Sequence, residues 1–303
     1  MRVIIAGGTG LIGSLLTRDL VNSGHEAIIL SRNPTQPVRS LPAGVQVVGW
    51  DGRTANGWGH LVEAVHAIVN LTGVSLSSGR WTKARKKQIV DSRILPGKAI
   101  LEAVQQAQHK PEDLIQSSGV NYYGTKGDHP VTEADPPGDD FLGRLCVQWE
   151  QSTQPVTEMG VRHVVIRTAP VLDRKGGALP LMLLPFRFFI GGPVGTGRQY
   201  FPWIHHADEV GAIRFLIDDA AASGPYNLIA PQAVTNREFA KTAGKVMHRP
   251  AIFPVPAFVM RLVFGEMSTI ILEGLQILPQ RLQEAGYSFR FPTLEAALKD
   301  VLA

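Results

Sequence analysis

MRVIIAGGTGLIG, residues 1–13, is the stretch that decides the fold. A short β-branched run at residues 2–6 leads into Gly7-x-x-Gly10-x-x-Gly13, and an amphipathic segment follows to about residue 23. Strand, glycine turn and helix in this order are the context in which the pattern indicates a dinucleotide-binding loop. The glycines permit a tight turn close to a pyrophosphate, and the helix N-terminus offers N–H groups to it. We therefore expect dinucleotide contacts from Gly7, Thr9, Gly10, Leu11, Ile12 and Gly13.

The same alternation of strand and helix patterns continues through the first half of the chain. Candidate strands are residues 26–31, 45–50, 66–71, 113–118 and 162–168. Residues 82–108 predict a long helix that is interrupted or kinked near Pro96, and residues 141–160 predict another that Pro155 bends. This order predicts an α/β fold, a Rossmann-type doubly wound parallel sheet.

Beyond residue 170 the composition changes. Residues 176–206 are rich in glycine, proline and aromatic residues, which suggests irregular chain over a cleft. A short strand is expected at 226–230, and helices are expected at 235–248, 256–266 and 293–302, with Asp208 capping the helix that it begins. We expect an NADP-binding domain at 1–170, to which 205–230 return, and a smaller C-terminal α/β substrate domain at 171–303.

Composition limits the class of protein. The 303 residues are 44% hydrophobic and 18% charged, and the formal charge of +4 is mild. The basic run at 83–88 is interpreted as a solvated helix face, and no apolar run reaches the roughly 18 residues of a membrane span. The single cysteine, Cys146, rules out an internal disulfide. We expect a cytoplasmic protein with a small-molecule substrate and with no nucleic-acid, membrane or metal partner; the oligomeric state stays open.

The end of the second strand indicates the cofactor type. An NAD site usually places Asp or Glu there for the ribose 2′-hydroxyl, whereas this chain has Ser31 and Arg32. A hydroxyl and a guanidinium can bind a 2′-phosphate, so NADP(H) is favoured. Asp51 is a candidate contact for the adenine. The end of the fourth strand should lie beside the adenine ribose and supplies Asn70, Leu71, Thr72 and Gly73.

Several longer stretches carry a resemblance to a known family. They are MRVIIAGGTGLIG, NLTG at 70–73, GRWTKARKKQIVDSRI at 79–94, SSGVNYYG at 117–124, WE at 149–150, LPLMLLPFRFFIGGPVGTGRQYFPWIH at 179–205 and LEGLQILPQRL at 272–282. On these the whole chain resembles the atypical, extended short-chain dehydrogenase/reductases, and among them the YfcH-like epimerase-family proteins. The resemblance implies a Rossmann NADP(H)-binding domain, a small C-terminal domain over the cleft, and Pro170 and Val171 beside the nicotinamide.

A literal Tyr-x-x-x-Lys, Tyr122 to Lys126, matches the catalytic signature of short-chain dehydrogenases. The signature requires one helix face, and Gly124 should break any helix there. By the resemblance, the catalytic helix is residues 141–150, where Leu142 and Cys146 occupy the tyrosine and lysine positions. The match is therefore interpreted as a decoy. Ser118, Tyr122 and Tyr123 remain catalytic candidates, with a tyrosine preferred for proton transfer; the alternative is that both rings only pack.

The substrate side also departs from the family pattern. Extended members that bind nucleotide sugars carry an arginine where this chain has Phe201. Arg198 or Arg187 could compensate, although each is also typical of a surface arginine. An aromatic wall that includes Trp203 and Trp81 would suit a flat, apolar substrate. His205 completes the substrate candidates.

Three functions stay open. The first is an NADP(H)-dependent oxidoreductase on a small carbonyl or alcohol, without the usual Tyr-x-x-x-Lys pair. The second is a nucleotide-sugar epimerase or dehydratase. The third is a non-catalytic NADP(H)-binding sensor or scaffold. Cofactor turnover separates the third function from the others, and sugar-nucleotide binding separates the first two.

Overall fold

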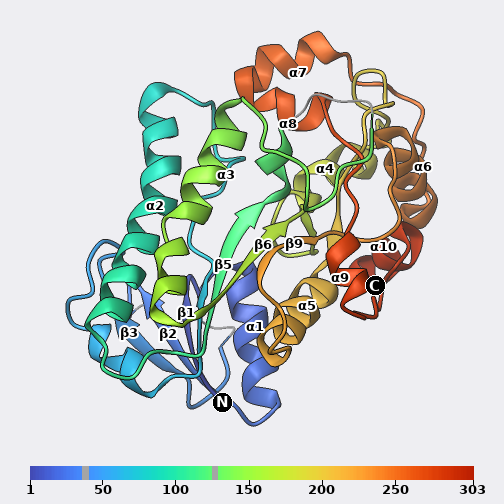
Figure 1. Cartoon of the computed structure of the whole chain (residues 1–303). Coiled ribbons are helices and arrows are strands. Elements are labelled where there is room, and N and C mark those ends of the chain that lie inside the picture. The colour runs from blue at the N-terminus through green and yellow to red at the C-terminus, as the bar shows by residue number, and fades with distance from the viewer. Residues whose placement is uncertain (36–40, 125–128) are drawn as a thin grey trace.

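The computed structural model describes residues 1–35, 41–124 and 129–303. Its centre is a parallel sheet in the order β3-β2-β1-β4-β5-β6-β9 (Figure 1). The strands are β1 (Arg2–Ala6), β2 (Glu26–Ser31), β3 (Gln46–Gly49), β4 (Ala67–Asn70), β5 (Asp113–Gly119), β6 (Arg162–Thr168) and β9 (Gly224–Leu228). The order reverses between β1 and β4, and ligands of such sheets bind at the carboxyl ends of the strands beside that reversal.

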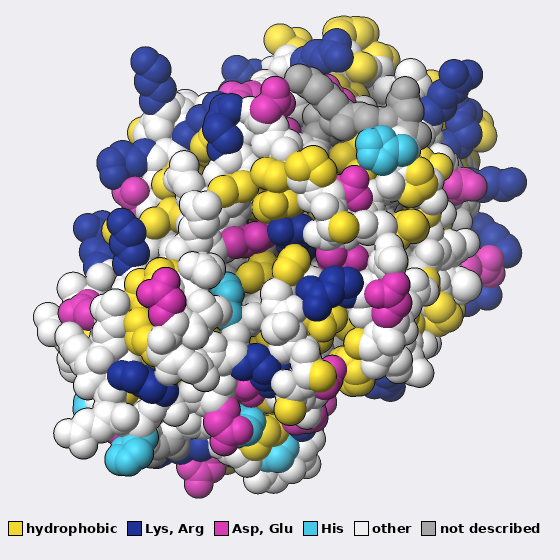
Figure 2. Space-filling model, in the orientation of Figure 1, with side chains coloured by type: hydrophobic (Ala, Val, Ile, Leu, Met, Phe, Trp, Pro, Cys, Tyr) yellow, Lys and Arg dark blue, Asp and Glu magenta, His cyan; other side chains and the backbone are white. Residues whose placement is uncertain are grey.

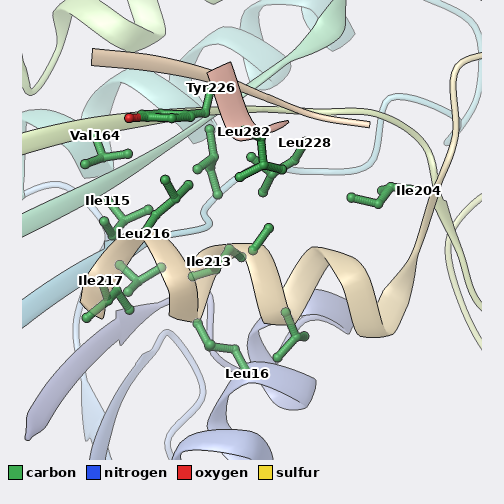
Figure 3. Close-up of a cluster of buried hydrophobic side chains, with 14 of the residues drawn as sticks. Leu16, Ile115, Val164, Ile204, Ile213, Leu216, Ile217, Tyr226, Leu228 and Leu282 are labelled. Atoms are coloured by element: carbon green, nitrogen blue, oxygen red, sulfur yellow. The ribbon is translucent and has the colours of Figure 1, made fainter. Parts of the chain in front are cut away.

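The inner strands β1, β4, β5 and β6 bury both faces, because helices cover the sheet on both sides. Val3 and Ile5 of β1 belong to one core cluster with α1 (Leu11–Asn22) and α5 (His206–Asp218). Ile4 belongs to the other cluster, with α2 (Lys83–Gln106). Figure 3 shows how α5 directs Ile213, Leu216 and Ile217 toward the strands of the first cluster. Alternate side chains of a strand point to opposite faces, so an unbroken apolar run is what a doubly covered strand requires.

Two of the expected helices differ from the structure. The predicted interruption near Pro96 is wrong, because α2 runs without a break through that residue. Pro96 and Gly97 are buried, and Ile100 and Val104 fill the core beyond them, so tertiary packing holds the helix despite the lost hydrogen bond. The helix expected at 141–160 is two elements, α3 (Phe141–Gln151) and the 3-10 helix η3 (Gln154–Met159), which ends at Gly160.

The C-terminal part has its own core. α4 (Leu179–Arg187), α6 (Asn236–Met247) and α10 (Leu294–Leu302) surround it, and residues before α4 and after β9 contribute. Helix α4 lies in the stretch that was expected to be irregular, and its apolar side chains are what the core receives. The shorter elements are 3-10 helices η1 (Gly59–Ala64), η2 (Val120–Tyr123) and η4 (Gly265–Ser268), helices α7 (Ala257–Phe264), α8 (Thr269–Leu272) and α9 (Gln280–Glu284), and the paired strands β7 (Val171–Leu172) and β8 (Ile204–His205).

Asp208 does not cap α5, contrary to expectation. The N-cap is His205, whose side chain accepts from the Ala207 amide. Asp208 is fully buried in the first turn and accepts from the amides of Arg290 and Phe291 at 2.7 and 2.9 Å. It therefore ties the chain before α10 to the sheet domain.

A group of exposed apolar side chains, here called the apolar surface, lies on α7, at the end of α4 and in the loop before α7. Figure 2 shows hydrophobic side chains gathered at the top of the molecule, over α7. The loop and the chain after α4 are adjacent, since the Phe253 amide donates to the Gly191 carbonyl. The members are Leu181, Leu184, Phe188, Phe189, Ile190, Ile252, Phe253, Phe258, Leu262 and Val263. In the described part of the chain, no helix has both the length and the apolar composition of a membrane span.

Candidate functional site

The glycine loop between β1 and α1 leaves room only for backbone. Gly7 has φ +84°, and a Cβ there would lie 2.8 Å from the Leu71 carbonyl oxygen. A Cβ on Gly13 would lie 2.4 Å from the Gly7 carbonyl oxygen. No side chain caps α1, so the N–H groups of its first turn remain available to an anion. The loop thus has the geometry that a dinucleotide pyrophosphate requires.

An exposed cationic side chain, Arg32, follows β2. Ser31 is 7% exposed, and its hydroxyl accepts from the Asn33 amide at 3.2 Å. Arg32 is exposed beside it. Asp51, the candidate adenine contact, accepts from the amides of Thr54 and Arg53, and these bonds lower its pKa. Its carboxylate therefore shapes the turn after β3.

The segment after β4 lies against the glycine loop. Asn70 is fully buried; its amide donates to Gln116 at 2.9 Å and its oxygen accepts from the Thr72 hydroxyl at 2.6 Å. The Leu71 carbonyl is the group that faces Gly7. Asn70 thus fixes the loop, while the backbone from Leu71 to Gly73 remains at the cofactor side.

The catalytic candidates belong to one polar network at the carboxyl ends of β5 and β6. Ser118 donates to Glu150 of α3 at 2.7 Å. Arg167 of β6 forms a bidentate pair with Glu150, at 2.9 and 3.0 Å, and donates to the Tyr123 hydroxyl at 3.0 Å. Burial alone would lower the pKa of Arg167, but the hydrogen bonds and charge of Glu150 raise it overall. Sequence analysis did not select Arg167, because an arginine in an apolar strand gives no local sign of its partner.

The two tyrosines have different roles in this network. Tyr123 is 5% exposed, accepts from Arg167 and donates to Asn227 at 2.7 Å, and burial raises its pKa to about 12. Its hydroxyl is therefore committed to joining β5, β6 and β9. Tyr122 is partly exposed, with the Arg167 guanidinium 3.4 Å from its ring centre, and its hydroxyl has no hydrogen-bond partner within the described residues. Of the pair, Tyr122 has the hydroxyl that no other described residue engages.

The Tyr122-to-Lys126 spacing does not lie on a helix. The 3-10 helix η2 ends at Tyr123, and Gly124 follows with φ +71°. Lys126 itself lies outside the described residues. On α3, Leu142 and Cys146 are buried one turn apart, and the Cys146 thiol lies 3.8 Å from the Gly119 carbonyl oxygen. Burial raises the pKa of this thiol to about 12, so the helix offers no acid there.

A second buried acid lies at the end of β6. Thr168 donates to Glu209 at 2.8 Å, and the other carboxyl oxygen of Glu209 has no partner within the described residues. Glu209 is fully buried, and burial raises its pKa to about 8. Pro170 and Val171, the second and third residues after Thr168, are partly exposed. Sequence analysis missed Glu209, whose position after Asp208 suggested only an acidic first turn of a helix.

The aromatic residues expected on the substrate side pack against other side chains, and Phe201 and Trp203 also line one small cavity. Trp203 is 1% exposed and its indole N–H donates to the Gln232 carbonyl at 3.1 Å. Trp81 is also buried, edge-on to Phe141. Phe201 packs against Phe239 with ring centres 4.4 Å apart, although it also lines a small cavity with Tyr200. Trp203 and Phe201 belong to the C-terminal core, whereas Trp81 packs in a separate cluster with Ile89 of α2 and Leu142 of α3.

The remaining substrate candidates divide between surface and core. Arg187 and Arg198 are exposed. His205 is fully buried, with its Nε2 3.1 Å from Asp300, and lies near His206. The ligand atoms of these three side chains lie close enough together to surround a metal ion. However, His205 Nδ1 accepts a hydrogen bond from the Ala207 amide. In a neutral imidazole the other nitrogen, Nε2, then carries the hydrogen and donates it in a hydrogen bond to Asp300. The arrangement is a hydrogen-bonded cluster without a free nitrogen lone pair on His205.

Comparisons with known proteins agree with this geometry. The profile of the NAD dependent epimerase/dehydratase family matches residues 3–141, and a domain of unknown function, DUF1731, matches residues 255–301. Epimerase family protein YfhF of Bacillus subtilis is 38% identical over 100% of this chain and 98% of its own length.

Two solved structures are also similar. The crystal structure of human epimerase family protein SDR39U1 (isoform 2) with NADPH superposes with a TM-score of 0.89 and 36% identity, over 99% of each chain. The nucleoside-diphosphate sugar epimerase of Corynebacterium glutamicum gives a TM-score of 0.79 and 30% identity, over 100% of this chain and 58% of that one.

Proposed function

This chain belongs to the NAD dependent epimerase/dehydratase family, and from that membership we propose that it is an NADP(H)-dependent oxidoreductase of a small carbonyl or alcohol. The observation that carries the proposal is the pair of features at the cofactor end. A glycine loop that has no room for a Cβ at Gly7 or Gly13 leads into the uncapped α1, and β2 ends in Ser31 followed by exposed Arg32 rather than in an acid. The SDR39U1 relative, crystallised with NADPH, supports the same choice of cofactor.

The residues that would hold NADP(H) follow from this geometry. The pyrophosphate fits the N-terminus of α1, and Arg32 can pair with the 2′-phosphate. The backbone from Leu71 to Gly73 and the Pro170–Val171 step would lie along the ribose and nicotinamide. When bound, the cofactor supplies or accepts the hydride at the substrate carbon.

The proton is assigned to Tyr122. Reduction of a carbonyl needs a proton on the oxygen as a hydride reaches the carbon, and a donor within hydrogen-bond reach can supply it. Tyr123 and Ser118 already donate to Asn227 and Glu150. The hydroxyl of Tyr122 is uncommitted within the described residues, and the Arg167 cation against its ring stabilises negative charge nearby. A tyrosinate formed in the reaction would recover its proton from solvent, since Tyr122 is partly exposed.

The test is hydride transfer with matched tyrosine variants. NADPH-loaded protein is mixed with small aldehydes and ketones, and deuterium from NADPH labelled at C4 is followed into the alcohol. Tyr122→Phe should lower turnover by about 10²- to 10⁴-fold at unchanged NADPH affinity. Tyr123→Phe is the control, which should lower stability but retain turnover. Tight NADPH binding without transfer to any carbonyl would instead favour the sensor or scaffold function.

A nucleotide-sugar epimerase is the second candidate, because the Corynebacterium relative is described as one. Such an enzyme returns the hydride to the same substrate, so NADPH is not consumed overall. Phe201, packed on Phe239, stands where an arginine would bind the diphosphate, and this weighs against that substrate. Interconversion of UDP- or dTDP-sugars without net cofactor oxidation would move the choice to the epimerase.

A further inference from the structure

Arg93 of α2 is a buried cation without an anion. The residue is 7% exposed. Its Nη1 donates to the Ile89 carbonyl at 3.2 Å and lies 3.4 Å from the Ser92 hydroxyl, and its Nη2 donates to the Val74 carbonyl at 3.2 Å. No carboxylate among the described residues lies within ion-pair distance, and no described acceptor takes the Nε–H. Burial lowers the pKa of Arg93 to about 10, which still leaves it charged at neutral pH.

The other well-buried arginines of the described chain are paired. Arg167 has Glu150 at 2.9 Å, and Arg162 has Asp113 at 2.7 Å. A guanidinium removed from water without a counter-charge is costly, and neutral carbonyls offset only part of that cost. Such a residue is retained where something else supplies the negative charge.

The guanidinium lies beside the proposed cofactor site. A Cβ on Gly73 would be 3.0 Å from the Arg93 Cζ, so the head group rests on the segment after β4 whose Leu71 carbonyl faces Gly7. Its other side is α3, where the Trp149 ring centre lies 4.8 Å from the Arg93 Cζ. The Trp149 Nε1–H is itself buried and has no acceptor within the described residues. Two neighbouring side chains therefore keep unused donors near the carboxyl ends of β4 and β5.

We propose that Arg93 binds the carboxylate of the substrate, so that the substrate is a small carbonyl or hydroxy compound carrying an acid group. This inference rests on the proposed oxidoreductase function and names its substrate class. A carboxylate matches the planar, forked donors of arginine and needs no further charge. The pyrophosphate of the cofactor is the other possible source of anionic oxygens, but the N-terminus of α1 already provides a site for it.

The experiment measures anion binding without turnover. Protein saturated with NADP⁺ is titrated with propionate and with propionamide, its uncharged counterpart, at constant ionic strength, and the shift in melting temperature gives the affinity. Propionate should stabilise the protein and propionamide should not. Arg93→Gln should weaken propionate binding at least tenfold at unchanged NADPH affinity. Arg261→Gln removes the same charge from an exposed position on α7 and should change neither.

Three results would overturn the proposal. One is equal stabilisation by propionate and propionamide. Another is unchanged propionate binding in Arg93→Gln. The third is a large loss of NADPH affinity in Arg93→Gln with propionate binding only the cofactor-free protein, which would assign the guanidinium to the cofactor phosphates.

The design covers two further situations. If Arg93→Gln does not fold, Arg93→Lys keeps the charge, and the contrast between propionate and propionamide in the unaltered protein needs no variant. Specific propionate binding by a protein that oxidises no NADPH would reject the proposed function while leaving the anion site in place.

Discussion

Arg167 decides which side chains at the carboxyl end of the sheet can do chemistry. Its bidentate pair with Glu150 and its bond to Tyr123 occupy two potential acids or bases within a buried network. Separating the partners of a buried ion pair leaves each charge uncompensated and is strongly destabilising. The network therefore holds these side chains in fixed positions. What remains for proton transfer is the side chain that the network touches only through its ring, Tyr122.

At the residue scale, Arg32 should set the preference between the two nicotinamide cofactors. We expect NADPH to bind at least about tenfold more tightly than NADH, because a guanidinium at the end of β2 pairs with the 2′-phosphate. Arg32→Ala should cost on the order of 1.5–3 kcal/mol with NADPH and leave NADH unchanged. Calorimetric titration of both cofactors measures this, and equal affinities in the unaltered protein would disprove it.

Glu209 should make stability depend on pH. Below about pH 4.5 the carboxyl is protonated in both the folded and unfolded chain. Between there and its folded pKa of about 8, only the unfolded chain releases the proton, so stability falls as pH rises. Glu209→Gln removes this loss and should stabilise the protein at pH 8 by a few kcal/mol more than at pH 5, since each pKa unit corresponds to roughly 1.4 kcal/mol. Urea unfolding at both pH values measures the difference, and parallel pH profiles for the two proteins would contradict it.

At the element scale, Asp208 should hold the C-terminal helix in place. Asp208→Ala removes the acceptor of the Arg290 and Phe291 amides, and a hydrogen bond to a charged group contributes about 1.5–3 kcal/mol. We expect a loss of that order in unfolding free energy, with faster amide exchange in α10. Asp208→Asn, which keeps one acceptor oxygen, should lose less. Equal losses in the two variants would show that the hydrogen bonds are not the cause.

The elements that sequence predicted are those with a local pattern. The strands from β1 to β6 are apolar runs bounded by turns, and the glycine loop carries its own geometry. The sequence shows that Pro96 removes a helical hydrogen bond, but it does not show the packing that keeps α2 continuous through this residue. Trp203 lies in a core whose other members come from distant helices, so no nearby residue could reveal its burial. Arg93 could not be predicted as a site residue for the same reason, since the sequence does not reveal whether a charged residue has an ion-pair partner.

At the scale of the whole molecule, the chain passes repeatedly between the sheet domain and the C-terminal part. It leaves the sheet domain after β6, forms α4, and returns through α5 and β9 before building the rest of the C-terminal part. The division proposed at residue 170 therefore does not cut the chain into two continuous domains, because residues 205–230 return to the sheet domain. Tyr122 and Arg93 both lie near the carboxyl ends of the strands, since η2 follows β5 and Arg93 contacts the segment after β4.

The apolar surface should govern how the whole molecule adsorbs to hydrophobic materials. Phe188, Phe258 and Leu262 are 68%, 69% and 70% exposed. Replacing all three with serine should shorten retention on a hydrophobic-interaction column, because contiguous exposed apolar area is removed. The melting temperature should change little, since exposed substitutions usually cost within about 0.5 kcal/mol each. Unchanged retention would show that other side chains dominate this surface.

Because Cys146 is buried, the rate at which its thiol is labelled reports how often the surrounding structure opens. As the only cysteine, 4% exposed and with a thiol that scarcely ionises at neutral pH, it should resist maleimide reagents until α3 separates from the sheet. The rate of labelling then reports the population of opened molecules. A second cysteine introduced at an exposed position would be the sole fast-reacting thiol. Fluorophores or spin labels could thus be attached at that introduced cysteine without first removing the native residue.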